Sequence, residues 1–234
     1  MVLISRGRGK RYTRVVMQRR QTPLPITKDV LAHMKQADPV LYKILAPYHG
    51  DVLARIVPKH TNKELFAALI HSIISQQLSI KAAAHIQARV TEACGGAVTP
   101  EVISGISETT LRACGLSGAK VKTVQALARA VETKELKLLS LRKASTDEAM
   151  EALTKIWGIG PWTAQMFLIF SLGAPDVFSA RDLILRRAVE TVHKLPPDSP
   201  IKTIEDIALA WSPYRTYVSL FFWQEKDKMK AYRN

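Results

Sequence analysis

Cysteine is scarce in this sequence, and long apolar runs are missing. The 234 residues include only two cysteines, Cys94 and Cys114, too few for a disulfide framework, a zinc site or a four-thiolate iron–sulfur site. Both lie in segments with a helical pattern and are expected to pack as small apolar residues. No apolar run is long enough to span a bilayer, and the N-terminus lacks the apolar region of a signal peptide. These absences predict an intracellular protein.

Acidic residues are also in deficit. The chain carries 20 Asp and Glu against 34 Lys and Arg, a formal net charge of +14. Such an excess favours a polyanionic partner, and nucleic acid is favoured over an acidic membrane because no amphipathic basic helix stands out. Charge alone is weak evidence, since ribosomal and RNA-binding proteins share it. Residues 1–22 are predicted to be a basic flexible arm, with these basic residues: Arg6, Arg8, Lys10, Arg11, Arg14, Arg19 and Arg20.

No segment shows the alternation of apolar and polar residues that a half-buried strand requires, so the predicted fold class is all-α. Thr61-Asn-Lys-Glu64 is a capping box, and the apolar residues after it predict a buried helix to about Ser75. The Thr99-Pro100 pair is typical of a helix start. Further helices are expected at about residues 26–36, 40–46, 81–94, 117–132, 181–194, 203–211 and 214–228.

The most informative stretch lies between residues 145 and 182. Ser145-Thr-Asp-Glu148 is a second capping box, which predicts a helix to about residue 156. Gly158-Ile159-Gly160 predicts a tight turn, because glycine adopts positive φ without a Cβ penalty. Pro161 then suits the first position of a new helix. Such a turn is often no more than a helix stop, but the backbone N–H groups of a hairpin between two helices can also bind an anion such as a DNA phosphate.

The combined pattern resembles the helix-hairpin-helix (HhH-GPD) DNA glycosylase superfamily. The run Leu153-x-x-Ile156-x-Gly-Ile-Gly-x-Trp162-Thr-Ala is followed by Asp182, 22 residues after Gly160. The likeness extends from about residue 60 to Trp223 and is greatest to the alkylbase (3-methyladenine) DNA glycosylase II branch. It implies a bilobal helix-hairpin-helix DNA glycosylase fold with the active-site cleft between the lobes. Residues 23–234 would form this domain, with a middle lobe at about 62–172.

The same resemblance implies a function. A monofunctional DNA-3-methyladenine glycosylase would flip alkylated purines from duplex DNA and hydrolyse the N-glycosidic bond, which initiates base excision repair. It would act as a monomer, in the cytoplasm and nucleoid of a bacterium or the nucleus of a eukaryote. The rival hypothesis is a non-catalytic helix-hairpin-helix protein that binds DNA or recognises its structure. Both need basic charge and the Gly-Ile-Gly turn, whereas Asp182 together with Trp162 and Trp223 favours the enzyme.

Asp182 matches the catalytic aspartate of the family. Cleavage of an N-glycosidic bond builds positive charge on the sugar, and a fixed carboxylate stabilises that charge and orients or deprotonates the attacking water. On position alone, Asp182 is equally typical of a helix N-cap. The family often has proline three residues before this aspartate, where this chain has Ser179.

Trp162 occupies the position where bifunctional members carry a catalytic lysine. Without that lysine no Schiff base forms, so the resemblance implies hydrolysis without lyase activity. Trp162 and Trp223 match tryptophans that line the base pocket of the alkylbase branch, where a cationic base would stack on electron-rich rings. Met166, one turn beyond Trp162, stands where a relative has tyrosine. The alternative is that both tryptophans belong to an ordinary core.

Two further contacts with DNA follow from the resemblance. The hairpin would contact a phosphate through Gly158, Ile159, Gly160 and Thr163. The polar turn at Gln77, Leu78 and Ser79 would supply the wedge that fills the gap left by the flipped nucleotide, with Gln77 as the first candidate. The alternative is a capped turn that only links two helices.

The resemblance implies no cofactor. A structural Na+ or K+ would be held at the hairpin by the backbone carbonyls of Thr154, Ile156 and Gly158. Lys120 and Lys122, in the first turn of the helix at 117–132, could hold a second phosphate or simply form a solvated basic helix end.

Overall fold

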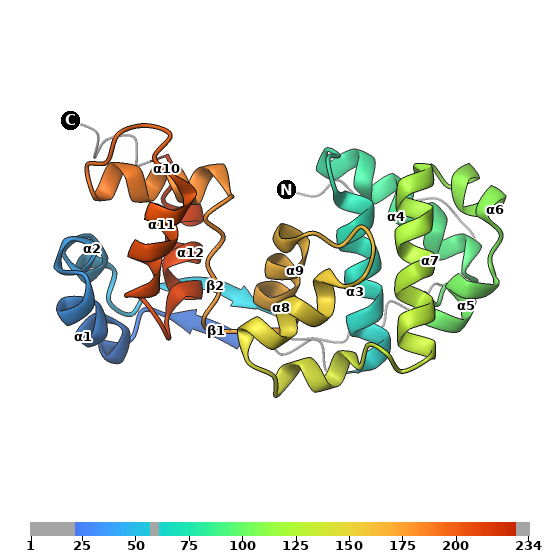
Figure 1. Ribbon diagram of the computed structural model, residues 1–234, viewed down its shortest axis with the longest axis horizontal. Helices are drawn as coiled ribbons and strands as arrows, with labels where there is room; N and C mark the ends of the chain where they lie inside the picture. Colours follow the sequence, from blue (N-terminus) through green and yellow to red (C-terminus); the bar gives the residue numbers. More distant parts are fainter. Residues whose placement is uncertain (1–21, 57–60, 228–234) are drawn as a thin grey trace, which may run out of the picture.

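The computed structural model describes residues 22–56 and 61–227, which form two helical lobes (Figure 1). The first lobe contains β1 (Thr22–Pro25), α1 (Lys28–Ala37), α2 (Pro39–Leu45), η1 (Ala46–Tyr48), β2 (Val52–Ile56), α10 (Leu183–Val192), α11 (Ile201–Leu209) and α12 (Arg215–Gln224). The second contains α3 (Asn62–Ser75), α4 (Ile80–Ala93), α5 (Pro100–Gly105), α6 (Glu108–Ala113), α7 (Gly118–Glu132), η2 (Leu138–Arg142), α8 (Thr146–Thr154), α9 (Pro161–Phe167) and the π-helix η3 (Leu168–Leu172). The predicted all-α class and the bilobal architecture are confirmed. The predicted basic arm lies outside the described residues, except for Thr22.

The expectation that no strand forms is wrong. β1 and β2 pair antiparallel, with Thr22 opposite Ile56 and Pro25 opposite Val52. Each strand has one partner, so both are edge strands, and an edge strand tolerates the two prolines of β1 because their missing N–H groups are not needed by a second neighbour. Strands this short, with proline at alternate positions, carry no readable periodicity.

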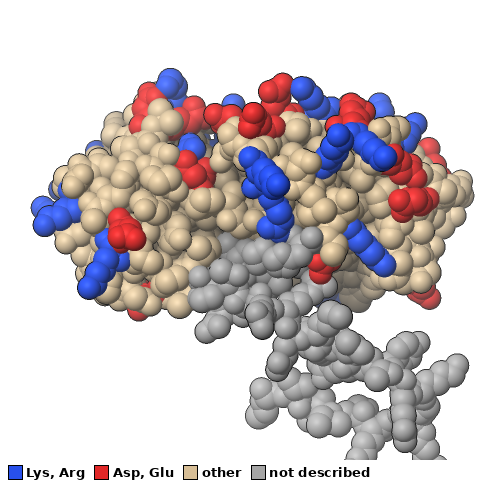
Figure 2. Space-filling model, turned by 90° about the horizontal axis from the view of Figure 1, so that it is seen from below, with Lys and Arg blue, Asp and Glu red and all other residues tan. Residues whose placement is uncertain are grey.

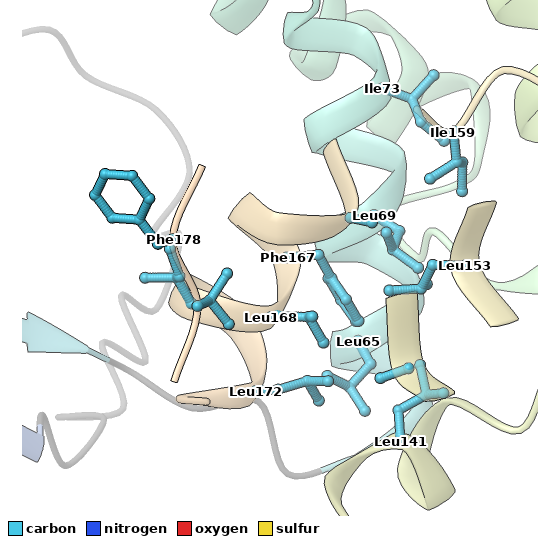
Figure 3. Close-up of a cluster of buried hydrophobic side chains, with 14 of the residues drawn as sticks. Leu65, Leu69, Ile73, Leu141, Leu153, Ile159, Phe167, Leu168, Leu172 and Phe178 are labelled. Atoms are coloured by element: carbon cyan, nitrogen blue, oxygen red, sulfur yellow. The ribbon is translucent and has the colours of Figure 1, made fainter. Parts of the chain in front are cut away.

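Helix α3 is the central element of the second lobe. Its N-terminus has the predicted capping box. The Thr61 hydroxyl accepts from the N–H of Glu64, and the Glu64 carboxylate accepts from the N–H of Thr61. Its six buried apolar side chains belong to one cluster with α8, α9 and η3, and Figure 3 shows Leu65, Leu69 and Ile73 in this cluster. Burial on this scale stabilises the lobe, since each buried aliphatic side chain contributes roughly 1.5–3 kcal/mol.

The remaining helices follow the sequence pattern closely, and the capping box at the start of α8 is confirmed. The short elements α6, η1 and η2 were not expected, because elements of so few residues are too short to show a periodic apolar pattern. Cys94 and Cys114 are buried, unpaired thiols. Within the described ranges, no helix has the length and apolar character required to cross a membrane.

A buried carboxylate organises the first lobe. Asp38 caps α2 by accepting from the N–H of Leu41 at 3.0 Å, and its other oxygen accepts from Nε1 of the fully buried Trp211 at 2.7 Å. Nε2 of His193 lies 3.2 Å from the same oxygen. Burial by itself raises the pKa of Asp38, but the neighbouring His193 imidazole and the hydrogen bonds from Leu41 and Trp211 outweigh it, so the pKa is lowered.

This lowered pKa makes the fold sensitive to acid. A carboxyl whose pKa falls on folding contributes stability above its ordinary pKa of 3.8, and the contribution is lost as the pH drops through the folded pKa. We expect Asp38→Asn to reduce the free energy of unfolding by about 1–3 kcal/mol at neutral pH, and the gap to the wild type to narrow in acid. Urea unfolding across a pH series measures this, with exposed Asp206→Asn as the control. A gap that stays constant with pH would contradict the assignment.

Candidate active site

Asp182 is the N-cap of α10, and it is also joined to α12. Its Oδ1 accepts from the N–H groups of Ile184 at 3.0 Å and Leu185 at 3.1 Å, and from Nε1 of Trp223 at 3.3 Å. All three donors use Oδ1, and Oδ2 receives no hydrogen bond from the described residues. The side chain is half-buried. One oxygen therefore fixes the carboxylate, while the other remains able to face a ligand.

The segment from Gly173 to Asp182 connects η3 of the second lobe to α10 of the first, and Asp182 ends it as the N-cap of α10. Its Asp176 carboxylate forms a bidentate pair with Arg215, with Nε–Oδ1 and Nη2–Oδ2 distances of 2.7 and 3.0 Å. Ser212 Oγ donates to the same carboxylate at 2.7 Å. Burial raises the pKa of Asp176, but Arg215 and Ser212 outweigh it and lower the pKa. The crossing segment is thus fastened to the start of α12 by a charged pair.

Hydroxyl groups of α12 fasten the same segment along its backbone. Thr216 Oγ1 donates to the carbonyl of Ala174 at 2.7 Å and accepts from the N–H of Val177 at 3.0 Å. Ser219 Oγ donates to the carbonyl of Val177 at 3.0 Å. Since α12 also carries Trp223, one helix sets the position of both Asp182 and its tryptophan partner.

Ser179 stands where the family often has proline. Its carbonyl accepts the N–H of Asp182 at 3.0 Å, which closes a turn just before the aspartate. The side chain is fully buried, and its Oγ has no partner in the described part of the chain. The turn is therefore made by the backbone and does not depend on a proline ring.

Two aromatic rings lie together next to this carboxylate. Trp223 stacks on Phe170 of η3, with ring centroids 6.0 Å apart and an angle of 27° between the planes. Phe170 is 45% exposed, and so is Trp162 in the first turn of α9. Sequence analysis missed Phe170, although it follows Trp162 and Met166 at four-residue intervals. The exposure of Trp162 argues against the ordinary-core alternative for that residue.

A hollow of about 280 Å³ opens beside these rings, between α3 and η3. Met166 and Phe170 line it on one side, and His71, Ser72 and Ser75 on the other. The predicted pocket residues Met166 and Trp223 are therefore both adjacent to Phe170, whereas Trp162 does not line this hollow. Among the described residues, the ring stacked on Trp223 is Phe170 and not Trp162. Their roles in base binding remain predictions.

The two hairpin glycines differ in what the fold requires of them. Gly158 has φ +83°, and a Cβ there would lie 2.0 Å from Thr123 Oγ1 on α7. Gly160 has φ −83° and ψ 170°, an extended conformation open to any residue, with empty space where a Cβ would stand. The expectation that both glycines need positive φ is wrong for Gly160. Ile159 is buried in the core (Figure 3).

The predicted wedge turn projects from the end of α3. Gln77 is exposed and has φ +55°, a left-handed conformation that is uncommon for a residue with a Cβ. Leu78 is exposed too, and Ser79 caps α4 by accepting from the N–H of Ala82 at 3.2 Å. Ser79 thus caps the following helix, while Gln77 and Leu78 stand at the exposed tip, and the wedge role of the turn stays a prediction.

Lys120 and Lys122 do not point together at an anion site. Lys120 Nζ donates to the carbonyls of Ile74 and Gln76 at 2.7 and 2.8 Å, and burial lowers its pKa. Lys122 Nζ lies 4.3 Å from the ring centroid of Trp157, a cation–π contact. Neither is simply solvated, and Lys120 is committed to the end of α3 rather than to a phosphate.

Most of the excess positive charge lies outside the described residues. Residues 22–56 and 61–227 contain 23 Lys and Arg against 20 Asp and Glu, so they account for only +3 of the net +14. On the face seen in Figure 2, basic and acidic side chains are interspersed. In the described part of the chain, no group of three or more His, Cys, Asp and Glu side chains could hold a metal ion.

The fold and the site define a helix-hairpin-helix protein with an anchored aspartate beside exposed aromatic rings. The family described as HhH-GPD superfamily base excision DNA repair protein matches residues 70–213, and this chain belongs to that family.

Relatives of known name are consistent with this membership. The chain is 35% identical over 169 residues to DNA-3-methyladenine glycosylase 1 of Schizosaccharomyces pombe, covering 69% of this chain and 72% of that protein. A crystal structure of a DNA-3-methyladenine glycosidase from Bacillus halodurans superposes with a TM-score of 0.78 at 31% identity, over 90% of this chain and 94% of that one. The S. pombe 3-methyladenine DNA glycosylase in complex with abasic DNA gives a TM-score of 0.66 at 28% identity, over 86% and 97% of the two chains. The protein is a DNA glycosylase, and its partner is DNA.

Proposed function

We propose that this protein is a monofunctional DNA-3-methyladenine glycosylase, which flips alkylated purines from duplex DNA and hydrolyses the N-glycosidic bond. The observation that carries the proposal is the asymmetric anchoring of Asp182. Three donors hold Oδ1, and none of the described residues donates to Oδ2, next to the stacked rings of Trp223 and Phe170. The enzyme acts as a monomer wherever the cell keeps its DNA.

The chemistry suits this arrangement. As the glycosidic bond breaks, positive charge grows on the sugar, and a carboxylate that cannot move away stabilises that charge without reorganisation. Its unbonded oxygen is available to orient or deprotonate the attacking water. An alkylated purine is cationic, so the exposed faces of Trp162 and Phe170 attract it more than a neutral base.

The hairpin and the polar turn would handle the DNA around the flipped base. Gly160 has open space on the side where a Cβ would stand, so a phosphate can approach its backbone closely. Thr163 is buried, and its Oγ1 accepts a hydrogen bond from the Gln76 amide, so it supports the hairpin from inside the protein. Gln77, with Leu78 and Ser79, would fill the space left in the helix stack.

We also propose that the hairpin holds a monovalent cation, Na+ or K+. The carbonyls of Thr154, Ile156 and Gly158 would hold it. The Ile156 carbonyl accepts from the N–H of Ile159 at 3.0 Å, and that of Gly158 from the Gln76 amide at 3.4 Å. Each carbonyl oxygen has two lone pairs, so a carbonyl that accepts one hydrogen bond can still coordinate a cation. Uncharged carbonyl oxygens suit a weakly held monovalent ion. When bound, the ion would add positive charge where the phosphate sits.

The rival function is a non-catalytic helix-hairpin-helix protein that only binds DNA. Such a protein needs the hairpin, but it has no use for a carboxylate with an unbonded oxygen beside exposed aromatic rings. Release of free base from methylated DNA distinguishes the two functions.

We expect Asp182→Asn to abolish base excision while duplex affinity stays within a few-fold. Asparagine keeps an oxygen that can cap α10, but it removes the charge that stabilises the cationic sugar, which costs on the order of 10²-fold or more in single-turnover rate. Release of base from methylated duplex measures it, with exposed Asp206→Asn as the matched control. Turnover like the wild type in Asp182→Asn would remove Asp182 from the catalytic role.

The hairpin glycines offer a matched pair of variants. Gly158→Ala should lower the free energy of unfolding by about 2–5 kcal/mol, because alanine is strained at this φ and meets Thr123. Gly160→Ala should leave stability unchanged yet weaken binding to damaged and undamaged duplexes alike, because its methyl group obstructs the phosphate. Thermal unfolding and fluorescence anisotropy measure the two effects. If Gly160→Ala bound both duplexes normally, the hairpin would not be the phosphate contact.

The absence of lysine at position 162 predicts that the product retains an intact abasic site. Lys155 is exposed and paired with Glu151 at 2.8 Å, and Lys120 is committed to α3, so neither replaces the missing amine. Strand breaks should appear only after alkali or an abasic-site endonuclease is added. Borohydride would reduce a Schiff base to a covalent protein–DNA adduct, and recovery of such an adduct would establish a lyase.

A further inference from the structure

The last turn of α3 and its C-cap Gln76, which lead directly into the wedge turn, are held by contacts from three other parts of the chain. Lys120 of α7 donates two hydrogen bonds at the end of α3, to the carbonyl of Ile74 in its last turn and to that of its C-cap Gln76. A helix leaves its final carbonyls without partners, and a cation at that end also complements the helix dipole. Lys120 is only partly exposed, so these bonds are shielded from water. Lys120 thus occupies carbonyl groups that water would otherwise hydrate, and it fixes the C-terminal end of α3.

Gln76 connects the same turn to the hairpin. Its Nε2 donates to Thr163 Oγ1 at 3.0 Å and to the carbonyl of Gly158 at 3.4 Å. A carbonyl can only accept, so the orientation of this amide is set by its partners. The residue whose backbone carbonyl is capped by Lys120 therefore also bridges, through its side chain, to the hairpin.

A third connection comes from α4. Gln87 Nε2 donates to Ser75 Oγ at 3.0 Å and to the carbonyl of His71 at 3.3 Å, and Ser75 Oγ donates to that carbonyl at 2.8 Å. The last turn of α3 is thus fixed from α4, from α7 and from the hairpin. Strained backbone such as that of Gln77 persists only where the surroundings over-determine it.

We propose that Lys120 is a positioning residue for base flipping. With Gln76, it joins the wedge turn to the hairpin as one rigid unit, so that seating the hairpin on the DNA backbone drives Gln77 into the helix stack. The proposal rests on the proposed glycosylase function and assigns Lys120 no contact with the substrate. It predicts a defect confined to the step in which the damaged base leaves the stack.

The test uses two duplexes that each contain one N7-methylguanine, either opposite cytosine or opposite an abasic site. Flipping is easier when the base has no partner, so a flipping defect should appear mainly on the paired duplex. Lys120→Met keeps the aliphatic stem and removes the N–H donors, whereas Lys120→Arg retains N–H donors. Exposed Lys202→Met, in the other lobe, is the control for the loss of one positive charge. Single-turnover excision at saturating enzyme and 2-aminopurine fluorescence beside the lesion are measured for each.

We expect Lys120→Met to excise about ten-fold more slowly on the paired duplex, and within about three-fold of the wild type opposite the abasic site. The 2-aminopurine signal should fall in parallel, duplex affinity should stay within about three-fold, and Lys120→Arg should recover most of the rate. Equal losses on both duplexes, or behaviour like that of Lys202→Met, would overturn the proposal.

Gln76→Leu provides a second variant, because it removes the bridge to the hairpin and leaves the backbone carbonyl for Lys120. It should show the same larger loss on the paired duplex even if Lys120→Met proves unstable, and equal losses on both duplexes relative to the wild type would overturn the proposal. Failure of the proposed function is distinguishable, since the wild type would then release base from neither duplex.

Discussion

The attachment of the crossing segment to α12 is the interaction on which the site depends. Residues 173–182 carry the aspartate from one lobe to the other, and a chain of this length could place it in many ways. The Asp176–Arg215 pair and the hydroxyls of Thr216 and Ser219 restrict it to one path. The tryptophan that bonds to Asp182 lies on the same helix. The position of the proposed catalytic carboxylate is thus set by α12 as much as by the aspartate itself.

The hairpin shows how fold and function divide a short motif between them. Gly158 is fixed by the protein, because its φ and the proximity of Thr123 exclude any side chain. Gly160 is not, since its conformation suits every residue and its surroundings are empty. A glycine that the fold does not need is compatible with the close approach of a phosphate that we propose for Gly160. This physical distinction is invisible in a Gly-x-Gly pattern.

Sequence alone predicted the elements that depend on local signals. The capping boxes at Thr61 and Ser145, and Pro161 at a helix start, act over a few residues and are confirmed. What it missed depends on distant contacts. The bond between Trp223 and Asp182 joins residues 41 apart, and Lys120 reaches the end of a different helix. Phe170 follows Met166 at a four-residue interval, but that spacing could not reveal its stacking on Trp223, a residue of a distant helix.

The two interpretations of Asp182 that the sequence left open are compatible. An N-cap needs one acceptor oxygen, and a carboxylate has two. Here Oδ1 serves α10 and Trp223, which removes the freedom of the side chain to rotate away from the cleft. Electrostatic stabilisation of a cationic sugar is effective only when the charge is fixed before the reaction begins. For the proposed catalytic role, capping the helix would therefore be the means by which the second oxygen is held in position.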